Sequence, residues 1–317
     1  IYRCEVEVDN SSYLKSSQNG KILYSIADEG VVAFRVLPNG SLARLNSAKI
    51  KGMRGCHLST SKADDYIFIS GFHDGKITVL HLNEDGSVGD IADGVFHKGL
   101  GSVAERSFRP HVSCSRLTPD ERFLMVADLG IDQIKVYRFD HKDGKIALVD
   151  TIRCELESAP KYFMFSSDGR FFYVLYEMKN VIEVYSYKEG ERVPIVEKIQ
   201  TISSTGSKPN QLTAACAMHF SPDEKHVFCS NAGDNTVSMY DRDDETGMLT
   251  LRFCLPISGD YPKDIAIFPG GEHLASINHE GSISFFKIDY EKGLLVMSDR
   301  SIKVNEPNCC EIVKIGD

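Results

Sequence analysis

Short apolar stretches alternate with polar turns along the whole chain, and the turns follow a common pattern. The pattern Ser-Pro-Asp-x-Lys-x-apolar-x-apolar occurs in six versions, with turn residues at positions 19, 64, 120, 168, 223 and 270. Pro fixes φ at the second turn position, while Asp, Asn and Gly tolerate the bend, so each version is typical of a hairpin turn. Successive turns are about 50 residues apart, which indicates an internal repeat.

Each repeat is predicted to contain several antiparallel strands. A short apolar strand precedes the turn, as at 57–60, 217–220 and 264–267, and a second strand follows it, as at 67–70, 123–127 and 172–175. A third segment comes after a few polar residues and has the alternating or wholly apolar pattern of a sheet. These third strands are predicted at 77–80, 134–137, 182–185, 236–239 and 282–285.

Antiparallel units of this length predict an all-β fold, a seven-bladed β-propeller of four-stranded blades that forms one domain over residues 1–317. The seventh blade is expected to close the ring by joining both chain ends, with 308–315 as one of its strands and with the N-terminal strand missing. A sandwich would not explain the fixed long period, and an open solenoid would need capping repeats. The absence of Trp argues against Trp-Asp and kelch repeats.

The charge balance excludes some classes of partner. The 317 residues include 36 Lys and Arg against 45 Asp and Glu, which gives a formal net charge of −9. Binding to nucleic acid by counterion release needs a basic face, and anionic membranes attract basic segments, so neither partner is expected. No apolar run approaches the ~20 residues that are needed to span a bilayer.

The nine cysteines predict neither a metal site nor a disulfide framework. They are scattered, odd in number and without C-x-x-C spacing, so we interpret them as reduced thiols of a cytoplasmic protein. The first residues contain neither an initiator Met nor the apolar core of a signal peptide. The chain is therefore expected to have lost its true start.

The most specific motif of the chain lies between residues 97 and 139. Arg-x-x-x-Pro-His at 106–111 is followed by Thr-Pro-Asp at 118–120 and by Asp-Leu-Gly-x-Asp at 128–132. This segment resembles the lactonase family of seven-bladed β-propellers, which includes propeller-type 6-phosphogluconolactonases and fungal carboxymuconate-lactonising enzymes. The similarity runs over essentially the whole chain.

The resemblance implies hydrolysis of a sugar-acid lactone, with 6-phosphogluconolactone of the pentose phosphate route as the substrate and with no metal or other cofactor. Opening a lactone needs a base to activate water, donors or cations for the oxyanion and, for a phosphorylated sugar, a cationic clamp. Polar residues next to inner propeller strands converge on one mouth of the central channel. The candidates are His111 and Glu177 as catalytic acid/base groups and Arg106, Lys161, His219 and Lys263 as substrate-binding groups.

Most of these candidates also have a structural interpretation. The His111 ring could tie a loop to the next blade, and Arg106 could donate hydrogen bonds between blades. His219 lies between Met218 and Phe220, which is typical of a satisfied core histidine. Glu177 is the stronger functional candidate, because an unpaired carboxylate after a buried strand would be costly.

Several positions differ from the pattern that is usual in the family. Ser113 stands in the place of a second His, Ala217 in the place of an acid and Ala232 in the place of an Arg. Lys161 and Lys263 replace Arg, and a lysine keeps the charge but loses the bidentate fork. These differences leave His111 and Glu177 as the remaining acid/base set.

Two rival functions stay open at this point. One is cycloisomerisation of a muconate-type dicarboxylic acid, which differs in that 6-phosphogluconate should not inhibit it. The other is a propeller that has lost its chemistry and serves as a binding platform for a sugar acid or a protein, which the residues at 113, 217 and 232 favour. The sequence does not indicate an oligomeric state.

Overall fold

The protein folds into β-strands and turns. The computed structural model describes residues 4–102, 108–206, 209–210, 212–298 and 301–315, and none of these residues is helical. This part of the chain accordingly holds no helix long and apolar enough to cross a membrane. The chain divides into unit 1 (Ile1–Glu157 with Glu311–Asp317) and unit 2 (Ser158–Cys310), and each unit has its own sheets.

The described residues of unit 1 form three four-stranded sheets, and each strand pairs antiparallel with the next one along the chain. The first sheet is β1 (Leu14–Ser16), β2 (Ile22–Ala27), β3 (Gly30–Val36) and β4 (Leu42–Lys49). The second sheet is β5 (His57–Thr60), β6 (Tyr66–Gly71), β7 (Lys76–Leu82) and β8 (Val88–Phe96). The third sheet is β9 (Val112–Leu117), β10 (Phe123–Asp128), β11 (Gln133–Asp140) and β12 (Lys145–Arg153).

The described residues of unit 2 repeat this plan in three further sheets. The first is β13 (Pro160–Phe165), β14 (Phe171–Tyr176), β15 (Val181–Lys188) and β16 (Ile195–Ser203). The second is β17 (Ala214–Phe220), β18 (His226–Ala232), β19 (Thr236–Arg242) and β20 (Leu249–Pro256). The third is β21 (Pro262–Ile267), β22 (His273–Asn278), β23 (Ser282–Asp289) and β24 (Leu294–Met297), and β25 (Ile302–Lys303) also pairs with β23.

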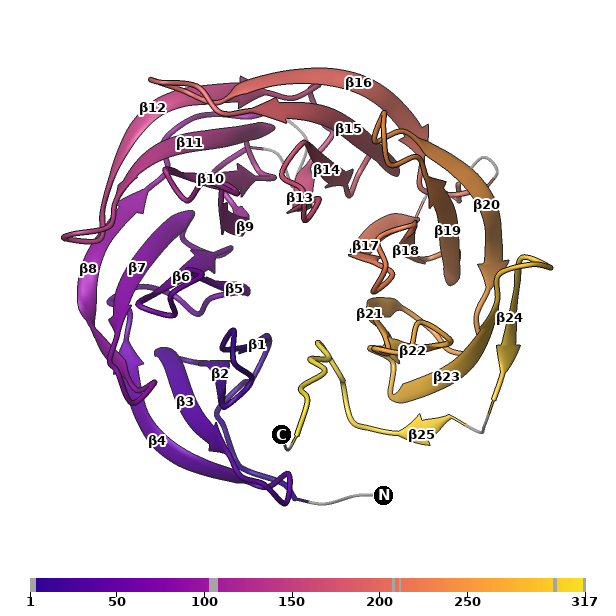
Figure 1. Ribbon diagram of the computed structural model, residues 1–317, viewed down its shortest axis with the longest axis horizontal. Coiled ribbons are helices and arrows are strands. Elements are labelled where there is room, and N and C mark those ends of the chain that lie inside the picture. The colour runs from indigo at the N-terminus through magenta and orange to yellow at the C-terminus, as the bar shows by residue number, and fades with distance from the viewer. Residues whose placement is uncertain (1–3, 103–107, 207–208, 211, 299–300, 316–317) are drawn as a thin grey trace. The chain divides into compact units, whose positions relative to one another are not determined.

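The sheets are propeller blades. Within each unit the first strand of every sheet lies innermost and the fourth lies outermost (Figure 1). Every residue of the second strands β6, β10 and β14 is buried, whereas most residues of the fourth strands are exposed or half-buried. The predicted strands and hairpin turns are therefore confirmed, with strand ends that lie at most four residues beyond the predicted ones. The seventh blade, its closure of the ring and the single domain stay predictions.

The strand predicted at 308–315 is wrong, because residues 304–315 form none. Hydrogen bonds between a backbone group and a side chain hold this segment, instead of a ladder of backbone pairs. In unit 2 the Cys310 N–H donates to Asp264 Oδ2 at 3.0 Å, and in unit 1 the Glu311 carboxylate accepts from the Ser16 N–H at 3.0 Å. Backbone groups that are satisfied in this way do not need a strand partner.

The hydrophobic core lies between neighbouring blades. In unit 1 one cluster joins the first two blades around Tyr24 and Leu58, and another joins the second and third blades around Phe68 and Val126. In unit 2 equivalent clusters lie on both sides of the middle blade. Fully burying one such side chain contributes about 1.5–3 kcal/mol, so blade-to-blade packing is the main source of stability.

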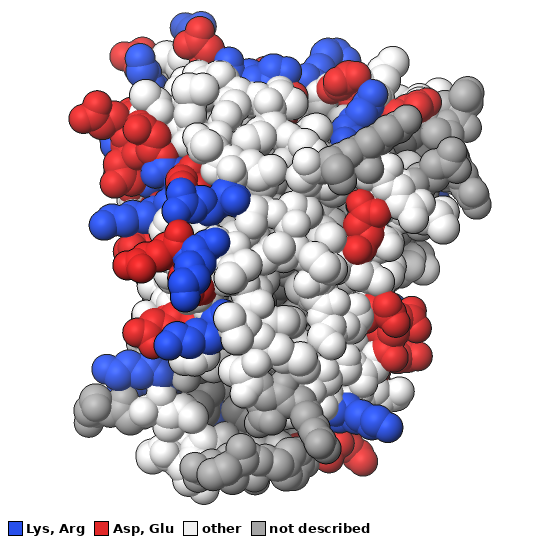
Figure 2. Space-filling view, turned by 90° about the vertical axis from the view of Figure 1, so that its right-hand side faces the viewer, with Lys and Arg blue, Asp and Glu red and all other residues white. Residues whose placement is uncertain are grey.

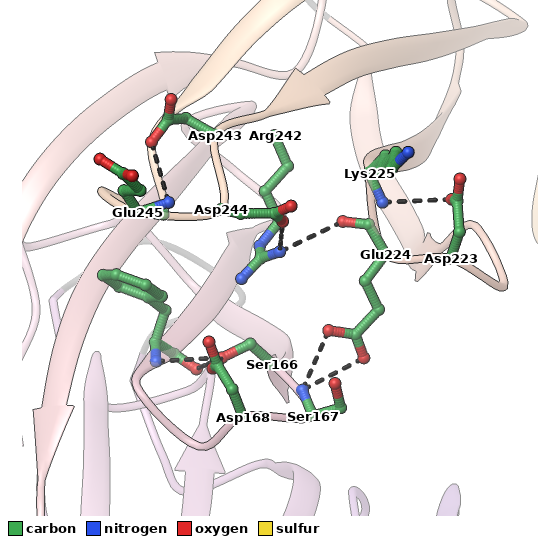
Figure 3. Close-up of polar contacts among 12 residues, drawn as sticks. Ser166, Ser167, Asp168, Asp223, Glu224, Lys225, Arg242, Asp243, Asp244 and Glu245 are labelled. Carbon is green, nitrogen blue, oxygen red and sulfur yellow. Dashed lines mark hydrogen bonds and ion pairs between the residues drawn. The ribbon is translucent and has the colours of Figure 1, made fainter.

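The hairpin turns that follow the inner strands also connect neighbouring blades (Figure 3). In unit 2 both carboxylate oxygens of Glu224, in the turn after β17, accept from the Ser167 N–H in the turn after β13, at 3.1 and 3.0 Å. Glu224 has a left-handed backbone with φ of 54°. The carboxylate therefore offsets part of the conformational cost by joining two blades.

The outward side on which β20 and β24 of unit 2 lie carries charges of both signs. Figure 2 shows Lys and Arg next to Asp and Glu along one margin of this side, and a broad area with neither. Surface ion pairs in unit 2 include Arg252 with Asp241 at 3.5 Å and Lys292 with Asp289 at 3.6 Å. Such a mixed surface differs from the continuous basic face that nucleic-acid recognition uses.

Candidate active site

The inner strands of unit 2 share a β-bulge near their beginning. In β13, Pro160 lies opposite Tyr176 and Tyr162 lies opposite Leu175, so that Lys161 is an extra residue in the ladder. The same irregularity makes Cys216 the extra residue of β17 and Lys263 that of β21. In unit 1, Ser113 has this position in β9. A bulge changes the direction of its extra side chain. Equivalent side chains near the beginning of these inner strands therefore depart from the regular alternation between the two faces of the sheet.

Lys161 and Glu177 form an ion pair beside the bulge of β13 in unit 2. Lys161 Nζ lies 2.7 Å from Glu177 Oε2, and the two side chains are 27% and 10% exposed. Glu177 directly follows β14, and its N–H donates to the Ala159 carbonyl at 2.9 Å. The bulge in β13 therefore aims the lysine at the carboxylate that ends the neighbouring strand. The structure thus brings these two predicted site residues together.

Charge interactions hold Lys161 in its ammonium form. Burial alone would lower the pKa of this lysine, but Glu177 and, more weakly, Cys216 and Tyr261 raise that pKa above its usual value. Burial raises the pKa of the Cys216 thiol, although Lys161 and Lys263 oppose this shift. The thiol is therefore neutral near pH 7, and it donates to the Ala214 carbonyl at 3.4 Å. The bulged side chains of all three blades thus lie within electrostatic range of one another.

His219 and Lys263 each have a protein partner in unit 2. His219 Nε2 lies 3.0 Å from Asp264 Oδ1, and Lys263 Nζ donates to Asn308 Oδ1. Asp264 is buried, and its carboxylate also accepts from the Ile265 N–H at 2.9 Å. These contacts join the inner strands of two blades to the C-terminal segment.

His111 belongs to unit 1, where it is buried next to β9. Its Nδ1 donates to the Phe72 carbonyl at 2.7 Å, and its ring stacks on that of Phe72 with centroids 4.4 Å apart. The His111 N–H donates to Asp128 Oδ1 at 2.7 Å. These contacts are those of a ring that ties a loop to the next blade, which is the structural alternative. Arg106 lies outside the described residues.

Two residues beside the site were missed at the sequence level. Tyr261, just before β21, exerts an electrostatic influence on Lys161, and its carbonyl accepts from the His279 N–H at 2.9 Å. His279 follows β22 as Glu177 follows β14. The internal repeat is the signal that could have found both. An alignment of the repeats would have to include the residue before each inner strand and the residue after each second strand.

A cavity of about 700 Å³ lies at the opposite ends of the inner strands in unit 1, beside the hairpin turns. Its charged lining residues are Lys21, Arg35, Lys314, Asp64, Glu84 and Asp85. It contains no His or Cys, and no acid–base pair like that of Lys161 and Glu177 lines it. Among the described residues of both units, no three His, Cys, Asp or Glu side chains are grouped to hold a metal ion.

Comparison with known proteins places this architecture in a family. The family model described as "Lactonase, 7-bladed beta-propeller" matches residues 3–312. The 6-phosphogluconolactonase of Bacillus subtilis is 26% identical over 313 residues, which cover 97% of this chain and 88% of that protein.

Solved structures agree with this placement. A structure from Bacteroides fragilis, provisionally assigned as a 6-phosphogluconolactonase, is 30% identical with a TM-score of 0.87, covering 96% of this chain and 88% of that one. The periplasmic gluconolactonase of Pseudomonas aeruginosa has a TM-score of 0.91 at 23% identity over 98% of this chain and 90% of that one, and it shares the fold. On the evidence of its blades, its inner hairpins and these matches, the chain belongs to the lactonase family of seven-bladed β-propellers.

Proposed function

We propose that the protein hydrolyses the lactone ester of a sugar acid, with Glu177 as the general base and Lys161 as the cation that stabilises the oxyanion. The observation that carries this proposal is the ion pair between the two side chains, at 2.7 Å, where the bulge of β13 meets the end of β14. Family membership and the names of the relatives support the type of reaction.

The reaction needs two proton transfers and one developing negative charge. Glu177 accepts a proton from water while the water oxygen bonds to the lactone carbonyl carbon. The carbonyl oxygen becomes an oxyanion, which the Lys161 ammonium stabilises. When this intermediate collapses, the ring C–O bond breaks and the proton returns to the departing alkoxide oxygen. The carboxylic acid product is ionised at pH 7, so each turnover releases one proton to the solution.

We propose a phosphorylated lactone, 6-phosphogluconolactone, as the substrate. The names of the relatives support this choice, and so does the positive charge that the bulges place at the site, on Lys161 and Lys263. Arg106 and His219 complete the proposed binding group. We keep His111 as a further proposed acid/base group, because its Nδ1 donates to the Phe72 carbonyl and its Nε2 is therefore the acceptor nitrogen of the neutral ring.

A binding platform without catalysis is the second candidate. Ser113 and Cys216 are the bulge residues of β9 and β17, and Ala232 ends β18, so these positions supply no charged group. The two candidates differ in one respect that can be measured. Both bind a sugar acid, but only the hydrolase accelerates proton release from the lactone.

The test is proton release from fresh 6-phosphogluconolactone in a pH-stat, corrected for spontaneous opening. We expect Glu177→Gln and Lys161→Met each to lower kcat by about 100-fold or more. Glu183→Gln is the matched control, because Glu183 forms a Lys–Glu pair with Lys198 at 2.9 Å in the same blade, between β15 and β16. The control should keep the wild-type rate. Wild-type protein that gives only the spontaneous rate would contradict the hydrolase, and binding of 6-phosphogluconate by that protein would then support the platform.

A further inference from the structure

Tyr261 has a backbone conformation that is costly for its side chain. Its φ is 59°, and it is the one aromatic residue among the non-glycine residues with positive φ in the described ranges. The left-handed conformation costs about 1–2 kcal/mol for a residue with a Cβ. Asn and Asp recover part of this cost through local hydrogen bonds, which a Tyr side chain cannot form. Strain of this kind persists only where the surrounding structure enforces it.

The neighbouring blade enforces this conformation. Asn235, in the hairpin between β18 and β19, accepts from the Tyr261 N–H at 2.9 Å through Oδ1. The Asn235 Nδ2 group donates to Asp260 Oδ1 at 2.8 Å, and Asn235 is itself left-handed with φ of 52°. The Tyr261 carbonyl accepts from the His279 N–H. Both backbone polar groups of Tyr261 are therefore fixed, which fixes the direction of its Cα–Cβ bond.

This direction keeps a large side chain at the level of the candidate site. Tyr261 is 39% exposed, and its ring centroid lies 5.8 Å from that of His279. The equivalent residue two blades earlier is Ala159. Its carbonyl accepts from the Glu177 N–H, just as the Tyr261 carbonyl accepts from the His279 N–H. Ala159 is also left-handed, with φ of 57°, but it is fully buried. The left-handed position before the inner strand is thus occupied by a small buried residue in one blade and by an exposed phenol in another.

We propose that Tyr261 contacts the substrate directly and donates a hydrogen bond from its hydroxyl to an oxygen of the lactone held by Lys161. The inference rests on the proposed function for its substrate class, a polyhydroxylated anionic ring. A phenol suits such a ring, since its hydroxyl is a donor and its face packs on the C–H groups of a sugar. Gly would remove the backbone strain at this position, so the Tyr side chain is kept at a cost in stability.

The test separates binding, catalysis and stability in two variants. Tyr261→Phe removes only the hydroxyl, and we expect kcat/KM to fall about tenfold and the dissociation constant of 6-phosphogluconate, measured by calorimetry, to rise severalfold with Tm unchanged. Tyr261→Gly relieves the backbone and should raise or preserve Tm while it weakens binding further. The control is Lys51→Gly in unit 1, an exposed residue with φ of 50°, which should raise Tm without an effect on activity.

The outcomes distinguish this inference from the proposed function. If wild-type protein binds 6-phosphogluconate but opens no lactone, the hydrolase fails, and weaker binding by Tyr261→Phe still supports the contact. If the wild type is active and Tyr261→Phe matches it in both kcat/KM and affinity, the inference is overturned and the function stands. If neither protein binds the product, the inference is also overturned.

Discussion

At the scale of single residues, the turns after the inner strands follow a rule that one sequence can reveal. The fourth turn residue is left-handed in each described turn, as in Asp64, Glu121 and Glu224. Each of these three carboxylates accepts from a backbone N–H in the preceding blade, namely that of Gln18, Lys62 or Ser167. Where the preceding blade has Pro222, which has no N–H, the fourth residue of the next turn is Gly271. A carboxylate therefore takes the left-handed position only where a donor faces it.

This rule gives a prediction for Glu224. Glu224→Ala keeps the backbone cost and loses the hydrogen bonds to Ser167, so we expect the free energy of unfolding to fall by about 1–2 kcal/mol. Glu224→Gly loses the same bonds but relieves the backbone, so its loss should be smaller. Urea unfolding of the two variants measures the difference. Equal losses would show that the left-handed conformation is not costly at this position.

At the scale of elements, the strands were predictable and the bulges were not. The apolar pattern of β10, for example, reads directly as a buried strand, because all of its residues are buried. The bulge at Lys161 depends on which residues pair across β13 and β14, and a single sequence does not record pairing. Lys161 and Glu177 could therefore be named as candidates, but their contact could not.

The end of β10 shows how an element is fixed by one buried carboxylate. Asp128 accepts from His97 Nδ1 at 2.7 Å, from the His111 N–H at 2.7 Å and from the Gly130 N–H at 3.1 Å. It thereby ties β10 to the segments that follow β8 and precede β9. Asp128→Ala would leave these buried donors unpaired.

We therefore expect Asp128→Ala to lower the free energy of unfolding by about 3 kcal/mol or more. Asp128→Asn keeps the shape and one acceptor oxygen, so its loss should be smaller. Thermal or urea unfolding checks both values. The central role of this carboxylate would be contradicted if Asp128→Ala were as stable as Asp128→Asn.

At the scale of the whole molecule, buried histidines set the response to acid. Burial, reinforced by Arg116 and Lys15, holds the pKa of His57 well below its usual value, and burial also lowers the pKa of His97 despite its bond to Asp128. Both residues are neutral in the folded protein, whereas in the unfolded chain they bind a proton below about pH 6.5. Their contribution to stability is therefore complete above that pH and is lost as the pH falls through it.

Between pH 6.5 and 5 we expect each of these histidines to reduce the free energy of unfolding by up to roughly 1.4 kcal/mol per pH unit. His57→Leu removes one titrating group, so the slope of stability against pH should become less steep, whatever the absolute stability of the variant. Urea unfolding at a series of pH values measures this slope. An unchanged slope would mean that His57 takes up a proton in the folded state.

The sequence predicted the strands of the blades correctly, but it predicted the C-terminal segment wrongly. The regular spacing of turns predicted the blades, since each hairpin is encoded locally. The segment 308–315 has the same apolar look but forms no strand, because Asp264 and Ser16 bind its polar groups instead. Apolar pattern alone does not tell whether a segment finds a sheet edge.

The location of the active site is the central claim, and a crystal structure of the protein soaked with 6-phosphogluconate tests it most directly. We predict density for the product at the bulge of β13, with its carboxylate within hydrogen-bond distance of Lys161 Nζ and beside Glu177. Product bound only in the cavity of unit 1 beside Lys21, Arg35 and Lys314, or no bound product, would contradict the claim.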